Sequence, residues 1–203
     1  MTLRLHSLAA VAFAATAAAA LAGAASAEPI GYSSDRDTVV LRYSFTHGEM
    51  AAAEDAPSIV VYGDGRAHVH YPAYMKRGGD RQVQLSRAEI TQVLNGISAA
   101  GLLDLEPRAL RAELRQAGRE MESGMTRADG IQEIQAVEIV SDPPRTVLEM
   151  NVVRGQGAAA RPVRKLLRWH NLQRDARRFK NVGALQGFAE AENRLTEIME
   201  RPN

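Results

Sequence analysis

The sequence predicts an α+β domain with an antiparallel sheet of about six strands, joined as hairpins, and two or three helices packed on one face. Two observations indicate this class. Several short segments alternate apolar and polar residues between turn signals, which is typical of half-buried antiparallel strands. Other segments space their apolar residues as a helix does, and they follow groups of strands instead of alternating with single strands.

Residues 1–27 predict a secretory signal peptide that is removed by cleavage. Arg4 precedes an apolar run from Leu8 to Leu21, and the stretch ends on Ala25-Ser26-Ala27, a small-residue cleavage pattern. The alternative is an uncleaved membrane anchor, but the run is shorter than the ~20 residues that span a bilayer. The chain has no Cys, which excludes a cysteine-linked lipid anchor. We therefore expect cleavage after Ala27, a periplasmic or secreted protein, and no transmembrane segment after cleavage.

Cleavage leaves a flexible leader, residues 28–37, and a single α+β domain over residues 38–203, a length that suits one hydrophobic core. Lys and Arg total 25 and Asp and Glu total 24, and Arg4 lies in the signal peptide, so the mature chain is formally neutral. Nucleic-acid binding depends largely on neutralised phosphates, which makes nucleic acid a poor partner for such a chain.

The first half of the domain predicts three strands and two helices. Thr38–Thr46 alternates cleanly, and Ser58–Tyr62 and Arg66–Tyr71 flank Gly63-Asp64-Gly65, a strong hairpin signal. A basic loop is expected over Pro72–Gln84. The capping-box pattern of Ser86 and Glu89 then predicts a helix over Arg87–Ala100, and Pro107–Glu122 is a weakly amphipathic outer helix.

The second half predicts three more strands and one helix. In order along the chain, these are a strand over Ala136–Ser141, a turn over Asp142–Arg145, a strand over Thr146–Val153, a flexible connection over Arg154–Arg161, a strand over Pro162–His170 and a helix over about Ala184–Glu200.

Catalytic motifs do not indicate an enzyme. The chain has no G-x-S-x-G, S-x-x-K or H-E-x-x-H pattern, no Cys nucleophile and no phosphate-binding glycine loop. A hydrolase that uses two carboxylates stays an alternative, because such residues need no sequence signature. The leading hypothesis is a non-catalytic exported protein that binds another component of the cell envelope.

Two histidines on one predicted strand suggest a metal site as an alternative function. His68 and His70 point to the same side of the strand, roughly 7 Å apart. Met75 follows in the next loop, and His47 and Met50 leave the end of the first strand. Imidazoles and thioethers together would suit copper or zinc. The competing interpretation is that both histidines are ordinary polar residues on the half-exposed side of a hairpin.

A basic segment over Arg154–Lys180 predicts a partner-binding surface. Arg164, Arg168 and His170 fall on one face of a strand, and the neighbouring Trp169 could stack with an arginine. These four residues are the candidate contacts for an envelope protein or an anionic envelope ligand. Two alternatives stay open: the acids of the last helix could neutralise this segment, and Trp169 could simply lock that helix onto the sheet.

Two stretches resemble a group of uncharacterised exported bacterial proteins. The first runs from Pro57 to Arg66 with its Tyr-Gly-Asp-Gly turn and continues through Leu85-Ser86 to Ala100-Gly101-Leu102. The second, Asn171–Phe179, is similar to the C-terminal part of those proteins. The shared motifs are structural, a turn and a helix end, so the resemblance implies no known activity and no catalytic residue.

Overall fold

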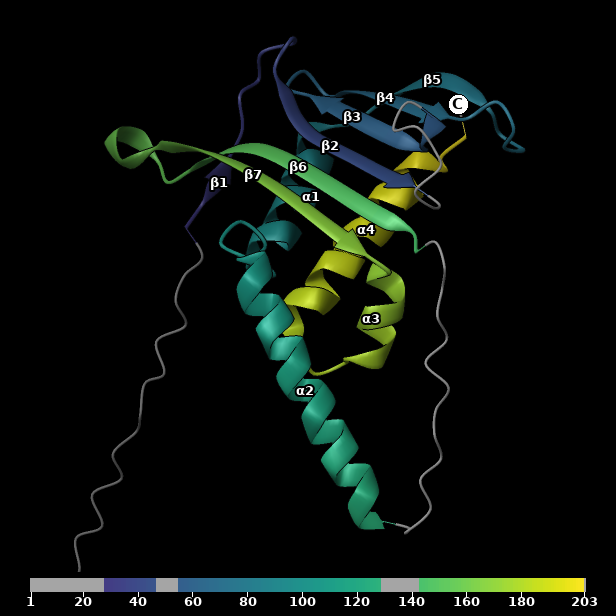
Figure 1. The fold of residues 1–203 in the computed structure, drawn as a ribbon. Helices are drawn as coiled ribbons and strands as arrows, with labels where there is room; N and C mark the ends of the chain where they lie inside the picture. Colours follow the sequence, from purple (N-terminus) through teal and green to yellow (C-terminus); the bar gives the residue numbers. More distant parts are fainter. Residues whose placement is uncertain (1–27, 47–54, 129–142, 203) are drawn as a thin grey trace, which may run out of the picture.

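A computed structural model of the chain describes residues 28–46, 55–128 and 143–202, with the side chains of residues 122–128 left out (Figure 1). The predicted signal peptide, His47, Met50 and the expected strand Ala136–Ser141 lie outside these residues. No helix in the described ranges is long and apolar enough to cross a membrane.

One antiparallel sheet of seven strands forms the centre of the fold. Because β7 pairs with β6 along its whole length, β1 and β2 share the other side of β6. The sheet therefore runs β7-β6-β2-β3-β4-β5, and β1 pairs with β6 beyond the end of β2, on the same side of β6. The strands are β1 (Ile30–Gly31), β2 (Val39–Thr46), β3 (Ser58–Tyr62), β4 (Arg66–Tyr71), β5 (Gly79–Gln84), β6 (Arg145–Arg154) and β7 (Arg161–His170).

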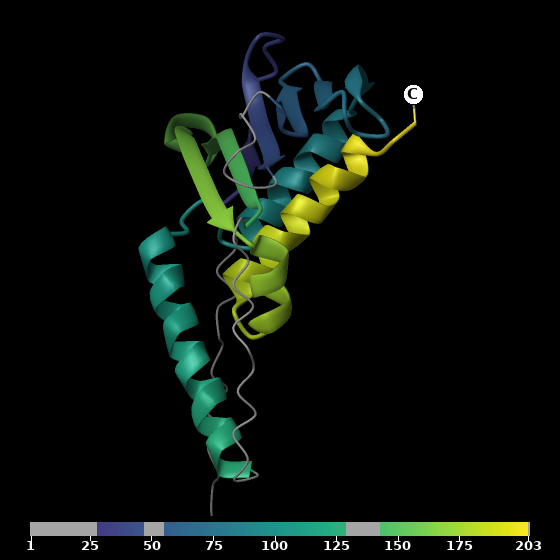
Figure 2. The same ribbon diagram turned by 45° about the vertical axis from the view of Figure 1, so that its right-hand side comes forward.

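Helices cover one face of this sheet. Figure 2 shows α1 (Arg87–Ala99) and α4 (Gly183–Met199) side by side along that face, while α2 (Pro107–Ala128) extends away from it. The short α3 (Leu172–Arg178) connects β7 to α4 and packs against α4. The α+β class and the antiparallel sheet with helices on one face are thus confirmed.

Local signals explain why α1 begins and ends where it does. Ser86 Oγ accepts a hydrogen bond from the Glu89 amide at 3.2 Å, and the Ser86 amide donates to Glu89 Oε2 at 2.8 Å. These two bonds satisfy amide groups that a helix N-terminus leaves unpaired. Gly101 follows the helix with φ of +69°, a conformation that favours glycine.

The core lies between the helix layer and the covered face of the sheet. Its largest fully buried side chains come from both layers, and β3, β4 and β6 bury every second residue along part of their length. These buried side chains include Ile59, Leu148, Met150 and Leu167 from the strands, Leu94, Ile97, Leu185, Phe188 and Leu195 from α1 and α4, Leu110 from α2, Leu172 from α3, and Leu102 from the turn after α1.

Three elements differ from the sequence expectation. Gly79–Gln84, expected as part of a basic loop, is the edge strand β5, which pairs with β4 although Val83 is its one apolar residue. Residues 28–37, expected as a flexible leader, contain β1, which pairs with Val153 and Arg154 of β6. Asn171, with φ of 57°, separates β7 from a helix that the sequence did not indicate, α3. β1 and β5 are held mainly by backbone hydrogen bonds to the neighbouring strand, which leave little hydrophobic pattern in the sequence.

Candidate functional site

The face of the sheet opposite α1, α3 and α4 is the candidate binding face, called the open face below. Residues directly opposite one another in a sheet point to the same face, so the strand register assigns its side chains. Tyr43 faces α4, where its hydroxyl contacts Glu192, and its neighbours Arg42 and Ser44 therefore face the open side. One row across this face is Gln82, His68, Val60, Arg42, Glu149 and Leu166, and the adjacent row is Asp80, His70, Ser58, Ser44, Val147 and Arg168.

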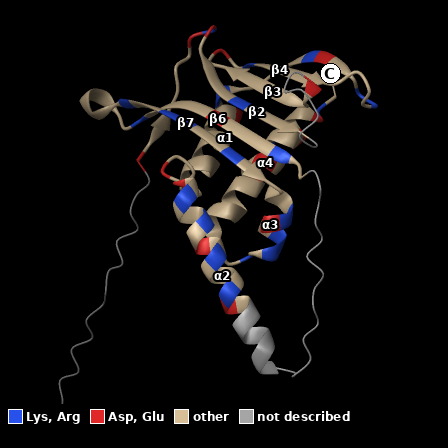
Figure 3. Ribbon diagram, viewed as in Figure 1, with Lys and Arg blue, Asp and Glu red and all other residues tan. Residues whose placement is uncertain are grey.

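Arginines gather at the β7 end of the open face, as the blue bands on β7 and β2 in Figure 3 show. Arg164 and Arg168 of β7 are exposed, and so is Arg42 of β2. Arg164 Nε donates to Asn151 Oδ1 at 2.9 Å, which orients its guanidinium. Leu166 lies between the two β7 arginines and is 44% exposed. We call Arg42, Arg164, Leu166, Arg168 and His170 the basic end.

Arg42 and Arg168 have no ion pair within the described part of the chain. Two other cations of β7 are engaged: Lys165 Nζ lies 3.4 Å from Glu106 Oε1, and Arg161 Nη2 lies 3.4 Å from Glu28 Oε2. Glu149 is the acidic residue in the same row as Arg42. Among the described residues, both guanidinium groups are thus exposed without an ion pair, an arrangement that suits contact with an external anionic group.

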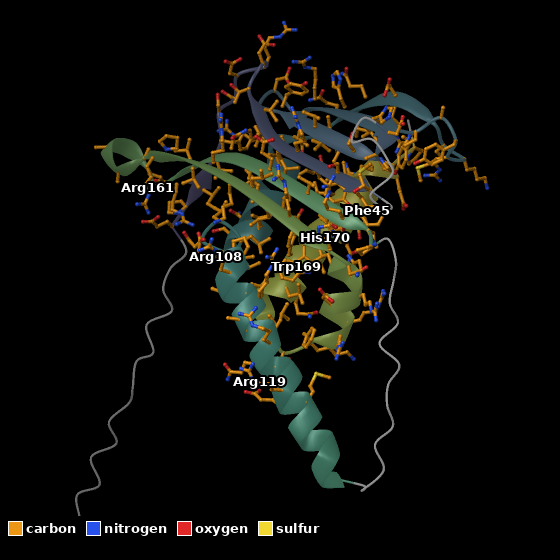
Figure 4. All side chains as sticks on the ribbon, viewed as in Figure 1. Phe45, Arg108, Arg119, Arg161, Trp169 and His170 are labelled. Carbon is orange, nitrogen blue, oxygen red and sulfur yellow. The ribbon has the colours of Figure 1, made fainter. Side chains whose placement is uncertain are left out.

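Trp169 is separated from the other three candidate contacts. Arg164, Arg168 and His170 are exposed on the open face, whereas Trp169 lies on the covered face and is 7% exposed (Figure 4). Its Nε1 donates to Asp175 Oδ2 at 2.8 Å, and the guanidinium carbon of Arg111 lies 6.0 Å from its ring centroid. Trp169 therefore fastens β7 to α3 and α2, and its stacking arginine comes from α2.

Burial raises the pKa of Asp175 above its ordinary value, although Trp169 Nε1–H, Arg174 and Arg178 act in the opposite direction. The desolvation of this carboxyl outweighs its favourable neighbours. Its hydrogen bond with Trp169 makes Asp175 part of the junction between β7 and α3.

His68 and His70 both reach the open face, but their rings turn to different neighbours. His70 Nδ1 lies 2.6 Å from Asp80 Oδ1, on the adjacent strand β5. The ring of His68 meets the ring of Tyr62 edge to face, with 5.4 Å between the centroids. Both histidines line a shallow hollow over β3, β4 and β5 together with Ser58, Val60, Asp80 and Gln82.

Of the three other proposed metal ligands, the structure describes only Met75. Met75 lies in the turn between β4 and β5, and His47 and Met50 lie outside the described residues. Over the described ranges, no three His, Cys, Asp or Glu side chains are grouped so that they could hold a metal ion. The observed neighbours of the two histidines are therefore Asp80 and Tyr62.

Sequence reasoning missed a buried polar cluster around Glu192 of α4. Glu192 is 4% exposed and accepts hydrogen bonds from Thr146 Oγ1 at 2.6 Å, Gln173 Nε2 at 2.6 Å and the Tyr43 hydroxyl at 3.2 Å. Burial, followed by the charge of Glu192, raises the pKa of Tyr43. One signal could have revealed the cluster: Glu192 falls within the apolar stripe of the last helix, between Phe188 and Leu195.

Comparison with known protein families, with curated proteins and with solved structures gives no match to this chain.

Proposed function

We propose that this protein is a non-catalytic exported binding protein, and that its basic end holds an anionic component of the cell envelope. The observation behind the proposal is that the guanidinium groups of Arg42 and Arg168 are exposed and have no ion pair among the described residues, with the exposed Leu166 near Arg168 on the same face of β7. Single apolar residues are common on the surface of monomeric proteins and do not indicate a binding site by themselves. A leucine between arginines on a sheet is a more specific indication of a binding surface.

The chemistry of arginine favours a ligand with carboxylate or phosphate groups. A guanidinium presents its donors as a planar fork that matches two oxygens of one anionic group. Arg164 and Arg168 are four residues apart on one strand, so their Cα atoms lie roughly 13 Å apart. A strand holds such a spacing rigidly, which favours a ligand with repeated anionic groups over a single small ion.

The position of α4 argues against internal neutralisation of this surface. The acids of the last helix, among them Glu190 and Glu197, belong to the layer that covers the opposite face of the sheet. Glu197 already pairs with Arg194 at 3.0 Å. The sheet therefore lies between these carboxylates and the basic end, which supports an external anionic partner.

The predicted signal peptide determines which anions are relevant. A protein exported after cleavage following Ala27 meets anionic lipid head groups, anionic envelope polymers and acidic segments of other envelope proteins. The proposal therefore covers an envelope protein or an anionic envelope ligand, and no role on nucleic acid.

The test is a binding titration with the protein recovered from the periplasm of an expression host. The probes are poly-L-glutamate and phosphatidylglycerol vesicles at low salt. Exposed ion pairs contribute about 1 kcal/mol each, so reversing both charges in R164E/R168E should weaken binding of at least one probe about tenfold or more. The control R36E/K76E makes the same change in net charge within two loops outside the basic end.

We expect the control to bind as the wild type does and binding to weaken as salt rises. Equal affinity of wild type and R164E/R168E for both probes would contradict the proposal, and so would no binding of either probe to any of the three proteins.

A further inference from the structure

We propose that an acidic, extended segment of a partner polypeptide adds to the free edge of β7 as an additional strand. This inference rests on the proposed function, because it names the kind of anion that the basic end takes. The partner segment would carry two acidic residues four positions apart with an apolar residue midway between them.

The first argument is the free edge. β7 pairs with β6 over all ten of its residues, from Arg161 to His170, and has no second strand partner within the described ranges. Along an edge strand, the N–H and C=O groups that point away from the sheet have no strand partner. These groups can form hydrogen bonds with an incoming chain. The opposite edge strand, β5, has six residues, so β7 is the longer of the two edges.

The second argument is the pattern of side chains along that edge. Arg164, Leu166 and Arg168 alternate onto the open face, and β7 contains no acidic residue. In paired strands, directly opposite side chains lie about 5 Å apart on the same face. A strand added beside β7 would therefore place an acid beside each arginine and an apolar side chain beside Leu166.

The same charges argue against a second copy of this chain as the occupant. Antiparallel pairing of two β7 strands centred on Leu166 would bring the arginines of the two copies opposite one another. Like charges directly opposite in a sheet are destabilising, and natural edge strands use Lys and Arg to prevent such self-pairing. An acidic strand removes this repulsion, so charge selects a different polypeptide.

The test separates backbone pairing from charge alone. The probe is a fluorescent peptide, Thr-Glu-Thr-Val-Thr-Glu-Thr with blocked ends, titrated against the periplasmic protein by anisotropy. Two further peptides carry N-methyl groups, one on its odd-numbered and one on its even-numbered residues. The N–H groups of alternate residues point to opposite sides of a strand, so only one of the two sets can face β7.

We expect one methylated peptide to lose at least about tenfold in affinity while the other binds within about twofold of the parent, and R164E/R168E to bind none of them well. Equal affinities of all three peptides would show charge attraction only and would overturn strand addition. Binding of phosphatidylglycerol vesicles without binding of the peptide would overturn strand addition but leave the proposed function intact. Failure of all these probes, with poly-L-glutamate included, would overturn both.

Discussion

Thr146 of β6 and Glu192 of α4 form a buried hydrogen bond that joins the sheet to the helix layer, with Oγ1 of the threonine 2.6 Å from Oε1 of the glutamate. Glu192 also accepts from Tyr43 of β2 and from Gln173 of α3. One side chain thereby links two strands and two helices. This polar cluster lies between the sheet and α4, where the apolar residues of α4 also pack against the strands.

Replacing Glu192 with leucine should destabilise the fold by about 2–4 kcal/mol, because two buried hydroxyl donors, of Tyr43 and Thr146, and the part-buried amide of Gln173 would lose this acceptor. The control is Glu190→Ala on the exposed side of the same helix, which should change stability by less than about 0.5 kcal/mol. Urea unfolding followed by circular dichroism measures both values. A stability of Glu192→Leu within the control range would show that the cluster does not hold the layers together.

Trp169→Phe should lower the stability of the fold without changing the affinity of the basic end for its ligand. The change removes the hydrogen bond from Nε1 to Asp175, which should cost about 1–2 kcal/mol of unfolding free energy. Binding of poly-L-glutamate at a temperature where the variant is folded should stay within about twofold of wild type, because the indole lies on the covered face. A large loss of affinity in the folded variant would place Trp169 in the binding site after all.

The capping box of α1 should make stability depend on acid. Hydrogen bonds from Ser86, followed by the Arg201 guanidinium, lower the pKa of Glu89 from 4.5 to about 2. A carboxyl group whose pKa is lower in the folded than in the unfolded state stabilises the fold at a pH above its unfolded-state pKa. This contribution is lost as the pH falls through its folded-state pKa. Glu89→Gln should therefore be less stable than wild type at pH 7, by about 1 kcal/mol as for other helix caps.

The difference between Glu89→Gln and wild type should shrink as the pH falls from about 4.5 to about 2. Denaturant unfolding at a series of pH values measures it. A difference that stays constant over this range would mean that the ionised carboxylate has no special role at the helix start.

Metal titration tests whether His68 and His70 bind copper or zinc. If His68 and His70 bind copper or zinc, His70 would use Nε2, because its Nδ1 contacts Asp80 and such a carboxylate contact is compatible with metal binding. Isothermal titration of Cu²⁺ and Zn²⁺ should then show binding that weakens in H68A/H70A by at least about tenfold. Equal heats for wild type and variant would assign both histidines to the polar surface of the hairpin.

Sequence periodicity located the elements whose side chains divide between core and solvent. β2, β3, β4, β7, α1 and α4 all show this pattern, and their observed bounds lie within two residues of the expected ones. β5 and β1 escaped prediction because backbone pairing holds them, with few apolar side chains to mark them. α3 escaped because its seven residues are too few to show a helical repeat.

The candidate site was predictable in part for the same reason. The period of two places Arg164 and Arg168 on one face and Trp169 on the other, but it does not say which face the helices cover. That choice is set by long-range contacts, in which the helices pack their apolar residues against one face of the strands. Likewise, the neighbour of His70 is Asp80, in a segment that the sequence presented as a loop.

Every proposed envelope partner depends on export of this protein from the cytoplasm. The most direct measurement is the intact mass and N-terminal sequence of the protein from fractionated cells that produce the full chain. We expect a product that begins at Glu28 and is recovered from the periplasm or the medium. A product that retains Met1 and stays in the cytosolic fraction would contradict the export, and with it the assignment of the basic end to an envelope ligand.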